Sequence, residues 1–141
     1  MDFYRTKSKL HLSTWDEKKL IMFELTPALE GAKGQPQAGD IRYNKDAKCT
    51  ISFDIEEAFK FAFCISLIIH GTDVNYQKMA DTSKVAGATE GEIKQLTAIK
   101  SNKGGMMITL KSGDRSVMLI LSPEEGYAVQ KYLEIKAGGY L

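Results

Sequence analysis

The feature that most constrains the fold is a signature that occurs twice, in which an apolar strand pattern leads through a capping box into a helix. In the first copy Asp54 is the cap and Glu57 follows three positions later, and in the second Ser122 and Glu125 have the same spacing. The side chains of such a pair satisfy each other's backbone amides at the start of a helix. Two boxes at the same offset from an apolar strand favour an internal duplication over coincidence.

The two copies align without a gap, with residues 41–69 matched to residues 109–137. A signature repeated at a fixed distance is typical of one structural unit used twice. The alignment predicts a single α+β domain over residues 1–141, with repeat unit one over about 1–71 and repeat unit two over about 72–141. Each unit is predicted to be a strand-rich antiparallel sheet followed by a helix, in a tandem arrangement.

The N-terminal segment has the alternation of a strand. Residues 3–12 alternate along their length, which predicts one strand with Arg5, Lys7 and Lys9 on the same face. Lysines two positions apart on a strand stand about 6.6 Å from each other, which suits the phosphates of an extended single strand. The apolar run 20–25 follows after a polar turn, so the two segments are predicted to form a hairpin.

The remaining elements follow from apolar periodicity and from the positions of Gly, Pro and the two caps. They are a loop at 31–39, a hairpin of 41–43 with 48–53, a helix at 55–69, strands at 73–80 and 92–100 around a loop at 81–91, a hairpin of 106–110 with 117–121, and a helix from Pro123 that stops at Gly138 and Gly139.

Composition excludes several classes of function. Nineteen basic and eighteen acidic residues give a formal charge of +1, so any attraction for a charged partner must be local. The first residues lack the basic and apolar regions of a secretory signal, which leads us to expect a cytoplasmic protein, or one in the host cytoplasm if it is viral. The longest apolar stretch, 58–69, is too short to cross a bilayer and is predicted to be a buried helix.

No set of residues in the sequence has the pattern of a catalytic or metal site. His11 and His70 are far apart and have no ligand set near them, and Cys49 and Cys64 lie among apolar neighbours without the spacing of a zinc site. The paired glutamates after each cap are explained by capping and by the helix dipole. We therefore expect no cofactor, no metal and no enzymatic activity.

The two strand-to-helix junctions carry a resemblance to known proteins. Residues 48–59, KCTISFDIEEAF, and residues 121–127, LSPEEGY, resemble the junction of the eukaryotic transcriptional positive cofactor four, a single-stranded-DNA-binding protein. The order of elements, used twice, resembles the Whirly fold of plant single-stranded-DNA-binding proteins and their bacteriophage relatives. The chain departs from these families where tryptophan at the helix start is replaced by Phe59 and Tyr127, and where a lysine-glycine-lysine-alanine motif is absent.

The resemblance implies sequence-tolerant binding of single-stranded nucleic acid, most simply DNA, in replication, recombination or transcription. A basic sheet surface with aromatic side chains that stack on bases is expected to form the site. The candidate binding residues are Arg5, Lys7, Lys9, Trp15, Tyr43, Lys48, Tyr76, Lys94, Lys100, Lys103, Lys111 and Arg115. For any one of them the alternative is structural, because lysines also protect exposed strands and aromatic residues in sheets are usually core.

The first helix is apolar around nearly its whole circumference, which predicts either a central position in the core or an interface between copies of the chain. The resemblance favours a homo-oligomer, with Phe59, Phe63, Ile65 and Ile69 at its interface. The alternative function is a structural or protein-interaction module, for example a viral one, that assembles through this helix and the C-terminal residues 138–141. The small net charge favours that alternative.

Overall fold

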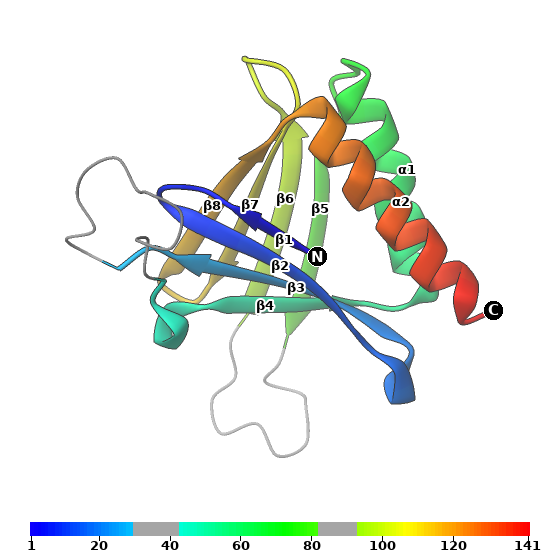
Figure 1. Cartoon of the computed structure of the whole chain (residues 1–141), viewed down its shortest axis with the longest axis horizontal. Helices are drawn as coiled ribbons and strands as arrows, with labels where there is room; N and C mark the ends of the chain where they lie inside the picture. The colour runs from blue at the N-terminus through cyan, green and yellow to red at the C-terminus, as the bar shows by residue number, and fades with distance from the viewer. Residues whose placement is uncertain (30–42, 82–92) are drawn as a thin grey trace.

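The computed structural model describes residues 1–29, 43–81 and 93–141, which form two four-stranded antiparallel sheets, each followed by one helix. The strands of the two sheets run in different directions, and the two helices lie side by side along one flank of the molecule (Figure 1). The α+β architecture with a tandem duplication, predicted from the repeated signature, is confirmed.

The element order is the same in both units. Sheet one contains β1 (Asp2–Tyr4), β2 (Ser8–Trp15), β3 (Leu20–Pro27) and β4 (Cys49–Phe53), with the short 3-10 helices η1 (Asp16–Lys18) and η2 (Lys45–Ala47), and is followed by α1 (Ile55–Ile69). Sheet two contains β5 (Tyr76–Asp81), β6 (Ile93–Lys100), β7 (Met106–Ser112) and β8 (Arg115–Leu121), and is followed by α2 (Pro123–Gly139).

Both helices begin at the predicted capping boxes. The Asp54 carboxylate accepts a 2.8 Å hydrogen bond from the backbone N–H of Glu57, and the Ser122 hydroxyl accepts one of 3.1 Å from Glu125; in each box the glutamate accepts a bond in return. α2 ends at Gly139, within the predicted pair of glycines, although Gly138 itself is still helical. A glycine disfavours a helix by only about 1 kcal/mol, which does not by itself end one.

The N-terminal segment is not one strand, as its alternation predicted, but two. The chain turns at residues 5–7, where the backbone N–H of Arg5 donates to Ser8 O at 2.8 Å, and β1 then pairs with β2. Arg5 and Lys7 therefore lie off the strands, and only Lys9 of the three cations stands on β2. Polar and apolar residues alternate through the turn as they do in a strand, so periodicity alone does not reveal it.

The second predicted hairpin is also wrong. β4 pairs with β3, in a register that joins Leu25 to Cys49, while Tyr43 makes a bridge to Ala28. A strand's own alternation shows which face is buried but does not identify its neighbour. In unit two β7 does pair with β8, as predicted. The gap-free alignment of the two units therefore holds from β4 and β8 into the helices, and it fails for the segments that precede β4 and β8. The predicted loops at 31–39 and 82–91 lie outside the described residues, β5 begins at Tyr76, and residue 81 belongs to it.

The inward faces of both sheets and one face of each helix form a continuous apolar core. At its centre Phe61 of α1 stacks on Phe53 with ring centroids 5.1 Å apart and on Tyr76 at 4.5 Å, and Phe23 packs against Phe53 and Phe61. Phe23 and Phe53 come from sheet one, whereas Tyr76 comes from sheet two. The helix of the first unit therefore joins the two sheets through aromatic contacts.

The sheets are also joined at their edge strands, β4 and β8, whose outer carbonyls have no partner within a sheet. The Ser8 hydroxyl of β2 donates to Met118 O of β8 at 2.6 Å, and the Lys94 ammonium of β6 donates to Thr50 O of β4 at 2.8 Å. When Phe53 is matched to Leu121, the strand registers place Ser8 on Lys94 and Thr50 on Met118. The two bonds are thus the same contact made in both directions.

Ion pairs repeat this exchange at the helix starts. Arg5 of unit one pairs with Glu125, the capping-box glutamate of α2, and also donates to Ile120 O of β8 at 3.2 Å. Lys78 of unit two pairs with Glu57, the capping-box glutamate of α1. Partial burial raises the pKa of Glu125, but hydrogen bonds from Arg5 and Ser122 outweigh it and hold that pKa below its usual value.

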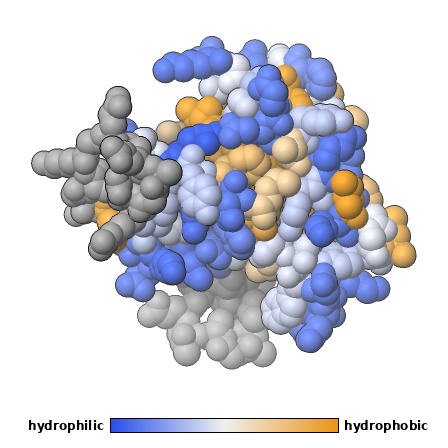
Figure 2. Space-filling model, viewed as in Figure 1, coloured by the Kyte–Doolittle hydropathy of each residue, from blue (hydrophilic) through white to orange (hydrophobic). Residues whose placement is uncertain are grey.

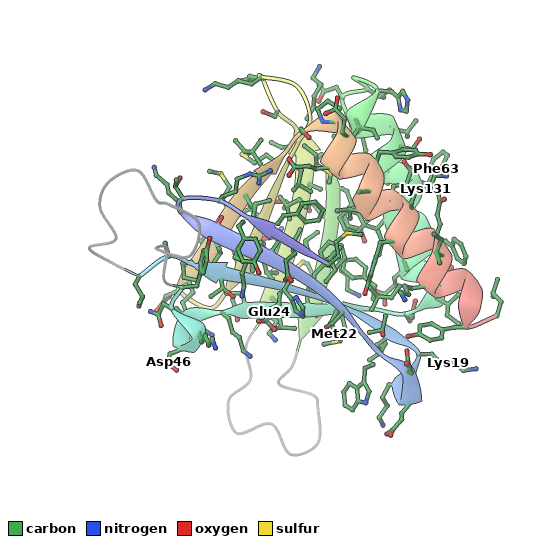
Figure 3. The ribbon with its side chains drawn as sticks, in the orientation of Figure 1. Lys19, Met22, Glu24, Asp46, Phe63 and Lys131 are labelled. Carbon is green, nitrogen blue, oxygen red and sulfur yellow. The ribbon has the colours of Figure 1, made fainter. Side chains whose placement is uncertain are left out.

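The helices approach closely where Gly126 of α2 faces Ile69 of α1. A Cβ atom at position 126 would stand 2.6 Å from the Ile69 side chain, so only glycine fits there without a shift. The buried face of α1 contains Ala58, Phe61, Ala62, Ile65 and Ile68. Phe63 of α1 and Lys131 of α2 are drawn on the outer side of the helix pair, away from the sheets (Figure 3).

Candidate nucleic-acid interface

The outward face of sheet one carries most of the polar and aromatic side chains that single-stranded nucleic acid would need. Along β2 the buried Leu10 and Leu12 alternate with Lys9 and His11, which point away from the core. Met22 and Glu24 occupy the same outward face on the neighbouring β3 (Figure 3). In the view of Figure 2, hydrophilic residues cover much of the surface around a smaller apolar area.

Two tyrosines flank a lysine on this face. The Lys9 ammonium lies 5.8 Å from the ring centroid of Tyr4 and 5.5 Å from that of Tyr43, and the two ring centroids are 6.1 Å apart. Tyr4 is 58% exposed, whereas Tyr43 is half-buried and donates its hydroxyl to Arg5 O at 2.8 Å. Burial raises the pKa of Tyr43, so this phenol stays a neutral donor. One ring is thus held in place while the other is open to a stacking partner.

Tyr4 and Lys9 border a shallow hollow of about 380 Å³ in the outer face of sheet one. Its lining combines one exposed aromatic ring, three lysines, a histidine, a threonine and two carboxylates, namely Tyr4, Lys9, Lys45, Lys48, His11, Thr26, Asp2 and Glu24. Asp2 is paired with His11 Nδ1 across the β1–β2 register. Glu24 lies 3.9 Å from the ammonium of Lys48, whose side chain is half exposed, so that pair is loose.

Four of the predicted binding residues have structural contacts instead of a place on an open face. Arg5, Lys94 and Arg115 bond across the junction of the two units, Arg115 by donating to Asp46 O at 3.4 Å. Tyr76 is stacked on Phe61, and burial raises its pKa. The sequence places these four on the binding surface because it does not separate a side chain that contacts a facing strand or helix from one that faces solvent.

The remaining predicted residues divide between the two sheets. Lys9 and Lys48 line the hollow on sheet one, Tyr43 lies beside Lys9, and Lys7 is exposed at the turn between β1 and β2. Trp15, at the end of β2, is exposed and has the Lys18 ammonium 5.9 Å from its ring.

On the second unit, Lys100 and Lys103 border a smaller hollow of about 280 Å³ at the β6–β7 turn, together with Met107 and Ile120. The tightest point of this turn is Gly105, where φ is +85° and a Cβ atom would stand 2.0 Å from Leu121 O. Lys111 is exposed on the outward face of β7.

The outward face of sheet two differs in kind from that of sheet one. Its exposed large residues are aliphatic or contain sulfur, and they are Met79, Ile93, Met118 and Ile120. Thr97 and Thr109 pair across its middle strands, opposite Met118. Among the described residues this face has no aromatic ring, whereas sheet one carries the exposed rings of Tyr4 and Trp15.

Of the eight residues that line the hollow, the sequence predicts Lys9 and Lys48 and misses six, namely Asp2, Tyr4, His11, Glu24, Thr26 and Lys45. Tyr4 falls within the alternation of one continuous strand, His11 is considered only as a metal ligand, and Lys45 lies in a predicted turn. The signal for Tyr4 and Lys9 is their spacing across a possible turn, which brings them opposite each other once β1 and β2 form a hairpin.

The predicted oligomer residues also divide. Phe59 and Phe63 are 37% and 66% exposed on the outer side of α1. Ile65, at 0%, is part of the core, so its assignment to an interface is wrong, and Ile69 is half-buried against α2. An all-round apolar pattern does not show which side of the helix is buried, because the side that contacts β4, β6, β7 and α2 is no more apolar in sequence than the side that faces solvent.

Metal-binding groups, cysteines and membrane-spanning helices were the remaining features considered in the sequence. Over residues 1–29, 43–81 and 93–141, no group of three or more His, Cys, Asp or Glu side chains is arranged to hold a metal ion. Cys49 is buried and Cys64 half-buried, they form no disulfide with each other, and burial raises the pKa of Cys64. None of the helices in these ranges has the length and apolarity to cross a membrane.

The chain has the Whirly fold, as the order of its elements, used twice, implied. The solved structure of WHY1 from Arabidopsis thaliana matches with a TM-score of 0.67 and 12% identity, covering 97% of this chain and 87% of that one. WHY3 from Arabidopsis thaliana matches with a TM-score of 0.65 and 13% identity, covering 99% and 88%. The plant transcriptional regulator PBF-2 matches with a TM-score of 0.64 and 17% identity, covering 97% and 79%. The sequence matches no protein-family model and no curated protein.

Proposed function

We propose that this protein binds single-stranded nucleic acid, DNA in the first place, across the outward face of sheet one and without catalysing a reaction. The observation that carries the proposal is Lys9 held between Tyr4 and Tyr43 at the border of the basic hollow. An exposed ring offers a stacking surface to any base, and lysines beside it neutralise phosphates. The shared Whirly fold supports the same function, because the family it implies binds single-stranded DNA.

Lys9, Lys45 and Lys48 are the cations of this surface, with Lys7 at its edge, and Tyr4 is its main stacking ring. The contribution of Trp15, farther along β2, is to extend the surface toward the β2–β3 turn. Such a surface recognises single strands over duplex, because paired bases present no free face for stacking. It fits a role in replication, recombination or transcription.

Fluorescence anisotropy with a labelled oligo-dT and a matched duplex, at two salt concentrations, tests the proposal. The single strand should bind more tightly than the duplex, and its affinity should fall steeply as salt rises. Absence of binding to either probe at low salt would end the proposal.

We further propose that copies of the chain assemble through the outer side of α1. Phe63 is the large apolar side chain most exposed on that helix, and Phe59 lies one turn before it on the same side. The helix therefore presents an aromatic stripe to solvent that a second copy can cover by a self-complementary contact. The alternative function, a protein-interaction module, would use the same stripe and would not require the hollow on sheet one.

Sedimentation equilibrium of Phe63→Glu tests assembly through α1. The change should give a monomer, whereas the matched change Met118→Glu, at an apolar residue exposed on sheet two, should leave the oligomer intact. If both variants and the unchanged chain sediment as monomers, assembly through α1 is wrong.

A further inference from the structure

We propose that the hollow on sheet one is a nucleobase site that prefers guanine, and that Glu24 reads the base; this rests on the proposed function of that face. The site is defined by the lining of the hollow, in which a carboxylate stands among lysines and beside an open tyrosine ring. A surface that contacts only phosphates would be weakened by a carboxylate in its lining, because the two groups carry the same charge.

The hollow contains charged side chains of both signs. Lys9, Lys45 and Lys48 attract phosphate, but Asp2 and Glu24 repel it at short range. Asp2 is already paired with His11, whereas within residues 1–29, 43–81 and 93–141 Glu24 makes one ion pair, the loose contact to Lys48. The group that satisfies Glu24 must therefore donate hydrogen bonds and carry no negative charge.

Guanine fits this requirement better than the other bases. Its Watson–Crick edge has two adjacent donors, N1–H and the N2 amino group, which match the two oxygens of one carboxylate. Cytosine and adenine offer one exocyclic amino group beside an acceptor, and thymine offers one N–H between two carbonyls. The acceptors of those three edges would face the Glu24 carboxylate and be repelled by it.

The surroundings of Glu24 suit a single stacked base. Register places Glu24 opposite His11 on β2, and Lys9, two residues before His11, lies opposite Tyr4 on β1. A base that lies against the Tyr4 ring can therefore turn its edge toward β3, while its phosphate stays near the lysines at the border. Unstacked bases are commonly read in this way, by an aromatic surface and by hydrogen bonds to the Watson–Crick edge.

Competition anisotropy tests the inference with oligo-dT competitors that carry a single central dG, dI, dA or dC. A single guanine cannot form a four-stranded structure, so differences report on the site. The dG competitor should bind about tenfold more tightly than dT alone, in the range expected for a bidentate contact. The dI competitor, which lacks only the N2 amino group, should fall between them.

Glu24→Gln should reduce the ratio of dG to dT affinity to about one, because a glutamine amide no longer accepts two bonds. Glu56→Gln, a change of the same kind on the exposed side of α1, should keep the ratio. Thermal melting by circular dichroism checks that both variants fold. Equal affinity for dG and dT competitors, or a preference that survives Glu24→Gln, overturns the guanine site but leaves single-strand binding intact. A chain that binds none of the oligomers overturns both.

Discussion

Sheets one and two have the same strand order and equivalent contacts between them, yet their outward faces have different chemistry. Inside, Ser8 and Lys94 occupy matched positions and bond to matched carbonyls, and each capping-box glutamate is paired with a cation from the other unit. Outside, sheet one carries tyrosines, lysines and carboxylates, whereas sheet two carries methionine, isoleucine and threonine with Lys111 among them. The contacts inside the molecule are thus equivalent in the two units, whereas the proposed function depends on the outward faces, where the units differ.

The largest effect is expected where the two units meet in the core. Phe61→Ala should lower the free energy of unfolding by about 3–5 kcal/mol, because Phe61 contacts rings of both sheets. Urea unfolding followed by circular dichroism should show one transition shifted as a whole, since one core serves both units. Phe63→Ala, on the exposed side of the same helix, should change the stability of the monomer by less than about 0.5 kcal/mol. Two separate transitions would mean that the units fold independently.

The next effect concerns the outward faces. Tyr4→Ala should weaken binding of oligo-dT by about 1–3 kcal/mol, the usual value of one base stacked on an aromatic ring. Met118→Ala removes an exposed side chain from the other sheet and should leave the affinity unchanged within about twofold. Anisotropy titrations of both variants against the same probe measure the difference. A larger decrease in affinity for Met118→Ala would assign the strand to sheet two.

A smaller effect is expected at the junction between the two units. Arg5→Ala removes the ion pair with Glu125 and the bond to Ile120 O, and we expect the free energy of unfolding to fall by about 1 kcal/mol, because the pair is partly exposed to solvent. Lys7→Ala, two residues away and exposed, is the matched control and should lower it by less than about 0.5 kcal/mol. Equal stabilities of the two variants would show that Arg5 does not hold the units together.

The smallest effect is a pH dependence at the same contact. Since the folded-state pKa of Glu125 is lowered, its contribution is fully present above the unfolded glutamate pKa of about 4.3 and is lost as pH falls through the lower folded value. Glu125→Gln should therefore reduce stability at neutral pH and narrow its difference from the unchanged chain below about pH 4. Glu124→Gln serves as the control. If the free energies of unfolding of Glu125→Gln and of the unchanged chain differ by the same amount from neutral pH down to about pH 3, the ionised Glu125 carboxylate does not stabilise the fold.

The parts of the fold predicted from sequence are those set by local chemistry. The capping boxes at Asp54 and Ser122 fix where each helix begins, and the alternation of β7 and β8 fixes a hairpin that turns around Gly113. These signals lie within a few residues of each other along the chain, so no tertiary information is needed to interpret them.

The parts that could not be predicted depend on which segments meet. Nothing in residues 48–53 indicates that β4 pairs with β3 across a long connection, and nothing near Lys94 indicates that a carbonyl of β4 lies opposite it. The candidate site was the least predictable part, because a lysine on a strand has the same sequence pattern whether it faces solvent or a neighbouring sheet. Lys9 and Lys48 could be named from the sequence, but the hollow they share with Tyr4 and Glu24 forms only in three dimensions.

The most direct test of the central claim is the salt dependence of oligo-dT binding by two charge-reversed variants. Lys9→Glu with Lys48→Glu alters sheet one, and Lys100→Glu with Lys111→Glu makes the same change in charge on sheet two. The first pair should weaken binding at least about tenfold and lower the slope of log affinity against log salt by about 1.4, because two phosphates are no longer neutralised. The second pair should retain the slope. Equally weakened binding by both pairs, with both proteins folded, would contradict a binding surface on sheet one.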